Sequence, residues 1–157
     1  MGKRLVNHGR STPYILTTAL LAVPAFAEPR GHWQFTEDGT GIELRSCRPG
    51  EAALCGAITQ LPKSAKALSS AQRRAVCGIA ILGDLQPAKA KGSELARLDG
   101  WVDDIESMTP EGKARRYTAS WVVRSENRAR LDVRGTFGIA IDQSQLVRAL
   151  APISDCR

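Results

Sequence analysis

The chain has 157 residues, with 22 basic and 16 acidic side chains and a formal charge of +6. Three of the basic residues and none of the acidic ones lie in residues 1–27, so residues 28–157 carry only +3. The basic residues between 124 and 134 are interrupted by Glu126 and Asp132, which is typical of a solvated strand face. Nucleic-acid binding, which favours clustered basic residues among aromatic platforms, is therefore not expected.

The first 27 residues have the parts of a cleavable export signal. Basic residues precede an apolar run from Tyr14 to Val23, and Ala25-Phe26-Ala27 supplies the small residues of a cleavage site. The run is well short of the roughly 20 apolar residues that a membrane-spanning helix needs. We therefore expect cleavage after Ala27, no stable membrane insertion afterwards, and a periplasmic or secreted protein.

Residues 28–157 contain no linker and are expected to form one domain of alternating strands. From Arg130 to Phe137 the apolar residues Leu131, Val133, Gly135 and Phe137 all fall on one face. Similar patterns and intervening turn residues give candidate strands at 32–36, 42–45, 55–61, 77–83, 101–107, 117–124, 130–137 and 145–151. The sequence thus predicts an all-β fold, a small antiparallel up-and-down barrel of about eight strands.

Two segments depart from this strand pattern. Lys63 to Val76 is predicted to be a short surface helix, whose narrow apolar stripe would consist of Leu68, Ala71, Ala75 and Val76. Gln86 to Gly92, which alternates Ala and Lys, is interpreted as a loop.

The four cysteines all follow the export signal, which favours disulfide bridges. They allow three pairings, and the sequence does not choose among them. Cys47 and Cys55 flank a connector rich in turn residues, so a bridge across this hairpin is the natural hypothesis, leaving Cys77 with Cys156. The spacings lack the paired Cys-x-x-Cys form of a structural zinc site, so no metal is expected.

The order of several landmarks resembles a family of exported bacterial proteins, domain of unknown function 2147. The landmarks are Gly31-His32-Trp33, Glu37-Asp38-Gly39, Leu54-Cys55-Gly56-Ala57-Ile58, Ile79 to Leu82, Gly100-Trp101, Pro110 to Lys113 with Tyr117, Leu131 to Gly135, and Gln145 with Arg148. The resemblance covers nearly all of residues 28–157. It implies a barrel like those of lipocalins and other calycins, with room for a ligand inside.

The chain departs from that family's pattern at two places. Leu146 stands where the family usually has a tryptophan, and Asp103-Asp104 where it usually has small residues. The resemblance supplies no catalytic residues to carry over, and no cofactor is expected.

Catalysis finds little support in the residues themselves. His32 is the single histidine after residue 27, and no Gly-x-Ser-x-Gly motif accompanies it. A hydrolase would have to use His32 or the acidic cluster of Asp103, Asp104 and Glu106, but strand alternation sends Asp103 to the opposite side from the other two. The segment Gly39-Thr40-Gly41 lies in a hairpin turn with no following helix, so it does not predict a phosphate site.

Aromatic residues are the stronger functional indication. An eight-stranded barrel has just enough interior to fill with side chains or to hold one small ligand. Inward-facing Ala119 and Gly135 favour empty volume, whereas Trp121 and Phe137 favour a filled interior. The predicted ligand-binding residues are Trp33, Phe35, Trp101, Tyr117, Trp121, Phe137 and Arg148.

Three hypotheses follow from the sequence. The first is a barrel that binds a small apolar or amphipathic molecule in its interior, oriented by Arg148 or His32 near a mouth. The second is a filled barrel that serves as an envelope structural or protein-interaction module. The third, less favoured, is the hydrolase. Neither the ligand nor the oligomeric state follows from the sequence.

Overall fold

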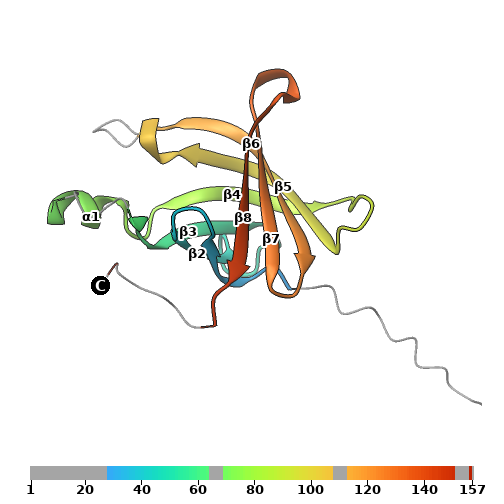
Figure 1. Cartoon of the computed structure of the whole chain (residues 1–157), viewed down its shortest axis with the longest axis horizontal. Helices are drawn as coiled ribbons and strands as arrows, with labels where there is room; N and C mark the ends of the chain where they lie inside the picture. Colours follow the sequence, from blue (N-terminus) through green and yellow to red (C-terminus); the bar gives the residue numbers. More distant parts are fainter. Residues whose placement is uncertain (1–27, 64–68, 108–112, 151–155, 157) are drawn as a thin grey trace, which may run out of the picture.

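Eight antiparallel strands, joined in chain order, close into a barrel in which the first strand pairs with the last (Figure 1). The computed structural model describes residues 28–63, 69–107, 113–150 and 156. The strands are β1 (Gly31–Phe35), β2 (Gly41–Ser46), β3 (Leu54–Gln60), β4 (Ala80–Ala88), β5 (Ala96–Asp104), β6 (Arg115–Ser125), β7 (Arg128–Arg134) and β8 (Ala140–Arg148). The predicted all-β antiparallel barrel is confirmed.

Alternation of apolar and polar residues explains why these segments face a common core. On β7, Ala129, Leu131 and Val133 are buried, while Arg130 and Asp132 between them face outward and are partly exposed. On β6, Ala119, Trp121 and Val123 belong to the core cluster, and Ser120 and Val122 between them are buried as well. Burying one face of every strand removes the apolar surface from water and closes the sheet.

Three strands lie at different positions from those predicted. β4 extends to Ala88 rather than Gly83, β5 covers Ala96–Asp104 rather than 101–107, and β8 ends at Arg148. The residues from Ala96 onward pair continuously with β6, and Pro87 and Ala88 pair with β5. Long-range pairing, which the local pattern does not reveal, therefore extends β4 into the expected loop and moves β5 towards the N-terminus.

The prediction that Phe137 and Gly135 face inward at the end of a strand is wrong. β7 ends at Arg134, and Thr136–Gly138 form a 3-10 turn in which Phe137 is 96% exposed. Gly135 creates no empty volume either, because the side chain of Ile141 occupies the space beside it.

Helix α1 spans Ser70–Val76, within the predicted 63–76 segment. The predicted apolar stripe is wrong at Ala71 and Ala75, which are exposed; Val76 alone of the described stripe residues packs against the barrel core. Leu68, the other member, lies outside the described residues. Among the described residues, no helix has the length and apolarity needed to cross a bilayer.

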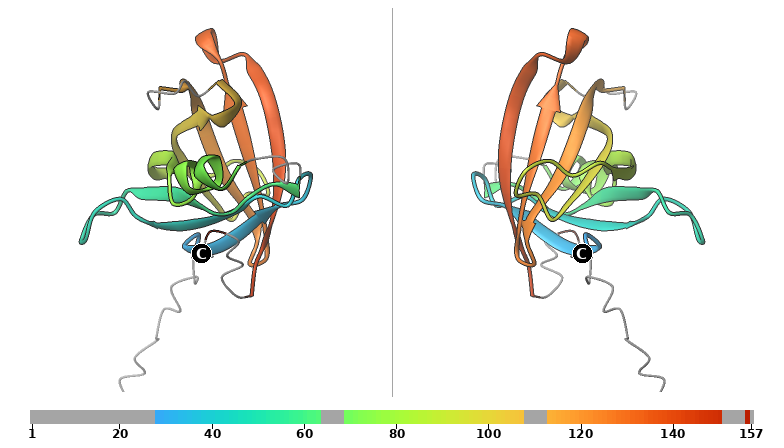
Figure 2. Two further views of the ribbon diagram at one scale, coloured as in Figure 1. Left: turned by 90° about the vertical axis from the view of Figure 1, so that its left-hand side faces the viewer. Right: turned by 90° about the vertical axis from the view of Figure 1, so that its right-hand side faces the viewer.

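Two disulfide bridges join Cys47 to Cys55 and Cys77 to Cys156, as hypothesised. The first bridge connects the end of β2 to β3 beside the start of β1, and we call this end of the barrel the N-terminal end. The other end, which carries the β1–β2, β5–β6 and β7–β8 connections, is the distal end. Figure 2 shows that the β7–β8 hairpin forms the outermost point of the distal end.

Candidate functional site

The middle of the barrel is filled by two tryptophans. Trp33 of β1 and Trp121 of β6 meet edge to face, with ring centroids 5.3 Å apart, and both are 0% exposed. Large aliphatic side chains pack around them, among them Leu44, Leu82 and Leu146. These side chains leave the N-terminal end of the barrel, rather than its centre, as the place for a ligand.

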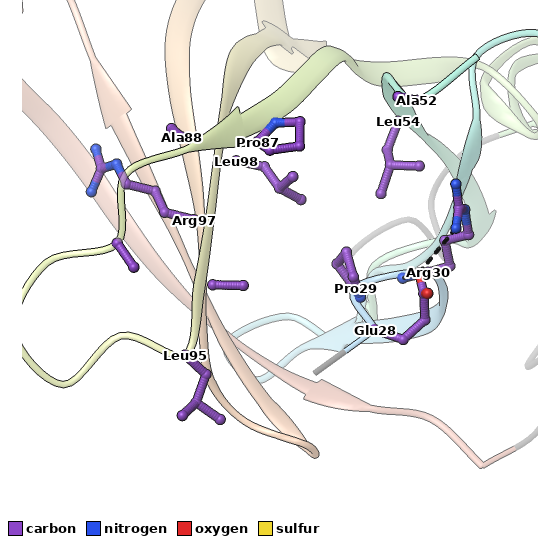
Figure 3. A pocket seen from close by; sticks show the side chains of 12 residues that line it. Glu28, Pro29, Arg30, Ala52, Leu54, Pro87, Ala88, Leu95, Arg97 and Leu98 are labelled. Atoms are coloured by element: carbon purple, nitrogen blue, oxygen red, sulfur yellow. Dashed lines mark hydrogen bonds and ion pairs between the residues drawn. The ribbon is translucent and has the colours of Figure 1, made fainter. Parts of the chain in front are cut away.

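A cavity of about 510 Å³ lies at the N-terminal end (Figure 3). Its walls come from the chain before β1, the β2–β3 connection, the end of β4, the β4–β5 connection and the start of β5. The lining residues are Glu28, Pro29, Arg30, Ala52, Leu54, Pro87, Ala88, Ala90, Leu95, Ala96, Arg97 and Leu98. Small and apolar side chains dominate this wall, which suits an apolar occupant.

The segment Glu28–Arg30 forms one wall of this cavity because side chains of the barrel fix its backbone. The indole Nε1 of Trp33 donates a hydrogen bond to the Pro29 carbonyl oxygen at 2.8 Å. Arg148 donates to the carbonyl oxygens of Arg30, at 2.8 Å, and of Glu28. The wall next to Pro29 is therefore held by β1 and β8 together.

Arg148 lies at a barrel mouth, but its guanidinium is occupied by the protein itself. Its Nε donates to the Glu126 carbonyl oxygen at 2.8 Å, in addition to the two bonds to the N-terminal segment. The guanidinium carbon lies 4.3 Å from the centroid of the Trp33 ring. This geometry gives Arg148 a structural role in shaping the cavity wall.

Charge is confined to the rim of the cavity. Glu28 and Arg30 form an exposed ion pair with 3.4 Å between Oε1 and Nη1. Lys89 and Lys91 lie on either side of the lining residue Ala90 in the chain, and neither has an ion-pair partner within the described ranges. The arrangement combines an apolar wall with exposed lysines that flank one of the lining residues.

Arg97 lines the cavity with its stem while its charged group lies on the outer face of the sheet. Its Nη2 donates to Ser120 Oγ at 2.6 Å, and its Nε lies 3.0 Å from Asp99 Oδ1. Its Nη1 is 3.6 Å from the Glu94 carboxylate. Figure 3 shows the guanidinium directed away from the space between Pro29 and Leu98. Arg97 is therefore engaged by the protein and does not present its charge to the cavity.

A second ion pair continues this polar outer face on β7. Asp132 accepts hydrogen bonds from Arg130 Nη2 at 2.7 Å and from Gln143 Nε2 at 3.0 Å. Burial alone would raise the pKa of Asp132, but these bonds and the nearby charge of Arg97 hold that pKa below its ordinary value.

The predicted ligand-binding residues do not meet at one place. Trp33 and Trp121 fill the core, while Phe35 and Tyr117 pack against its edge. Trp101 lies on the outer face, where the Arg116 guanidinium stands 3.5 Å from its ring centroid and pairs with Asp103. None of the seven predicted residues lines the cavity of the N-terminal end.

Residues considered for catalysis are also dispersed. His32 lies on the outer face of β1, where its Nδ1 is buried without a hydrogen-bond partner among the described residues. Asp103 pairs with Arg116 outside the barrel, whereas Asp104 lines a hollow at the distal end with Glu37 and Asp38. Within the described part of the chain, no group of His, Cys, Asp or Glu side chains is arranged to hold a metal ion.

Few sequence signals pointed to the residues that line the cavity. Pro29 and Ala90 lie in segments without strand periodicity, and Leu95 and Leu98 fall before the predicted start of the fifth strand. Starting the fifth strand at Ala96 instead of residue 101 places Leu98 in the core and Arg97 on the outer face. The alternation of residues 96 to 102 was therefore the signal that could have located these two lining residues.

The fold and the cavity define the class of this protein as a small closed antiparallel β-barrel with an apolar mouth. Comparisons with protein-family models, with curated proteins and with solved structures find no match to the chain.

Proposed function

We propose that this chain is an exported barrel protein that binds a small apolar or amphipathic molecule in the cavity at the N-terminal end. The observation that carries the proposal is the apolar wall around about 510 Å³, a volume within the range of small-molecule sites. The site lies at the mouth, because the tryptophan pair fills the centre of the barrel.

The surroundings of the cavity favour an amphipathic anion over a neutral apolar compound. An alkyl chain would contact Pro29, Leu54 and Leu98, while an acidic head group at the rim would meet the lysines beside Ala90. Burying the chain supplies affinity, and the exposed cations would supply orientation.

Export and a periplasmic or secreted location are part of the same proposal. The composition of residues 1–27 supports it, and two disulfide bridges are compatible with an oxidising compartment. A direct check is N-terminal sequencing of the protein recovered from the cell envelope, with Glu28 as the expected first residue.

Binding can be tested with dodecanoate and dodecanol as paired probes. Trp33 is hydrogen-bonded to the cavity wall at Pro29, so occupancy should change its emission, measured in a Trp101→Phe background to remove the outer ring. We expect saturable binding of both probes, with dodecanoate the tighter. Native mass spectrometry should show one bound molecule.

A filled cavity provides the matched variant. Ala90→Trp places a large ring at the cavity from a loop, and Ala75→Trp places the same ring on the exposed face of α1. The first should abolish binding and the second should leave it unchanged. Equal binding by both variants, or no binding by the parent protein, would refute the proposed site.

A further inference from the structure

The tip of the β7–β8 hairpin exposes three large apolar side chains, from the turn and the first residues of β8. Phe137 is 96% exposed, Ile139 66% and Ile141 54%. Figures 1 and 2 show this tip standing beyond every other strand of the barrel. Such a cluster at the outermost point is more than the scattered exposed apolar residues that most surfaces carry.

The backbone at the tip makes the choice of phenylalanine more unusual. Phe137 has φ of 62°, and Gly138 after it has φ of 74°. Two successive residues in the left-handed region are usually Asn-Gly or Asp-Gly, because a bulky side chain is disfavoured there. Asparagine would suit both the backbone and the solvent better than Phe137. The Phe137 side chain thus adds nothing to the barrel core and is available for a contact outside the barrel.

We propose that the β7–β8 tip contacts the surface of an anionic lipid bilayer. Phe137 and Ile139 would enter the boundary between head groups and acyl chains, with Arg134 at the level of the phosphates. The proposal does not depend on the cavity, which lies at the opposite end of the barrel.

Arg134 lies beside the tip and is the residue that would meet an anionic surface. Arg134 and Ile141 line the same hollow on the outer face, and Arg134 has no ion-pair partner among the residues described. Of the two carboxylates that line this hollow, Asp132 is bonded by Arg130 and Gln143, while Asp142 accepts a hydrogen bond from the neutral Ser144 hydroxyl and keeps its charge. Arg134 therefore places a guanidinium directly behind an apolar tip, which is the order of groups that interfacial segments present to a membrane.

The size of the tip favours a bilayer over a protein partner or a second copy. A stable protein interface buries roughly 800 Å² on each partner. Three side chains on a narrow turn supply only a fraction of that area, since a single aromatic side chain buries about 150 to 250 Å². Insertion into a lipid surface requires no matching flat area, because the lipids close around the side chains.

Vesicle co-sedimentation tests the proposal with oxidised protein that begins at Glu28, which retains every residue the structure describes. The vesicles contain either phosphatidylglycerol with phosphatidylethanolamine or phosphatidylcholine alone. We expect binding to the anionic vesicles that weakens with salt. Phe137→Asn should reduce it by roughly tenfold or more while leaving the thermal midpoint equal to or above that of the parent protein. Arg134→Gln should reduce it by roughly fivefold, and on anionic vesicles alone.

Leu150→Asn is the matched control, because Leu150 is 101% exposed and follows β8 at the N-terminal end. It should bind vesicles as the parent protein does. The proposal is overturned if the parent protein fails to bind, or if Phe137→Asn and Leu150→Asn behave alike. It is equally overturned if light scattering shows a dimer that Phe137→Asn dissociates, since the tip would then serve a second copy.

Discussion

The guanidinium of Arg148 stacks on the ring of Trp33, 4.3 Å from its centroid, and joins the last strand to the first. The two residues are also register partners across the β1–β8 seam. Both then bond the same short segment, Trp33 through the Pro29 carbonyl and Arg148 through the carbonyls on either side of it. The seam of the barrel and the wall of the cavity thus depend on one contact.

Replacing Arg148 with alanine should lower the free energy of unfolding by about 2 to 3 kcal/mol, because a cation–π contact and several hydrogen bonds are lost. Urea denaturation measures this loss, and hydrogen exchange should show faster exchange at Arg30 and Gly31. Arg148→Lys keeps the charge over the ring but cannot reach all three carbonyls, so its loss should be intermediate. An alanine variant as stable as the parent protein would contradict the structural role.

Removing the two disulfides should have unequal effects. The Cys47–Cys55 bridge spans 8 residues and the Cys77–Cys156 bridge spans 79. The chain-entropy model gives about 2.5 kcal/mol for the short loop and about 4.5 kcal/mol for the long one. Urea unfolding of the two Cys-to-Ala pairs should show the larger loss for the long-range bridge. The reverse order would indicate that the short bridge has a role in the native state beyond loop closure.

Asp132 should make the protein less stable in acid. Because its pKa is lower in the folded state than in the unfolded chain, the stabilisation is fully present above the unfolded value, about 3.9. It is lost as pH falls through the lower folded value, since the unfolded chain takes up the proton first. Urea midpoints measured in steps below about pH 5 should fall more steeply for the parent protein than for Asp132→Asn. Parallel curves would show that Asp132 does not contribute.

Gly100 should not tolerate a side chain. A Cβ at this position would lie 2.4 Å from the carbonyl oxygen of Gly83 and 2.8 Å from that of Asp84, both backbone atoms. Gly100→Ala should therefore cost roughly 2 kcal/mol or more, as measured by thermal or urea unfolding. Asp84→Gly is the contrasting variant. Asp84 lies where the register between β4 and β5 shifts, and its φ is 49°, a conformation that glycine accepts readily. It should change stability little.

Local alternation was sufficient for much of the barrel. β7 alternates cleanly because it packs one face on the core, and the predicted ranges of β6 and β7 largely agree with the structure. The cysteine pairing also followed from position, since Cys47 and Cys55 flank one connection. These features depend on residues close together in the chain.

The candidate site depends on residues far apart, and the sequence could not assemble it. Trp33 and Arg148 were both singled out, but their contact requires the barrel to close and bring β1 beside β8. Alternation continued past Gly135 predicts an inward Phe137, but the backbone reverses there in the turn Thr136–Gly138. The cavity itself is created when the chain at Pro29 folds back towards the end of β4.

Hydrogen bonding between β1 and β8 also sets an order of events during synthesis and oxidation. The cylinder cannot be sealed while β8 is still unmade, so closure must be a late step. Cys47 and Cys55, which emerge together, can pair before Cys77 appears, whereas Cys77 must wait for Cys156. The native connectivity is therefore the one that oxidation in order of emergence would produce, without later reshuffling.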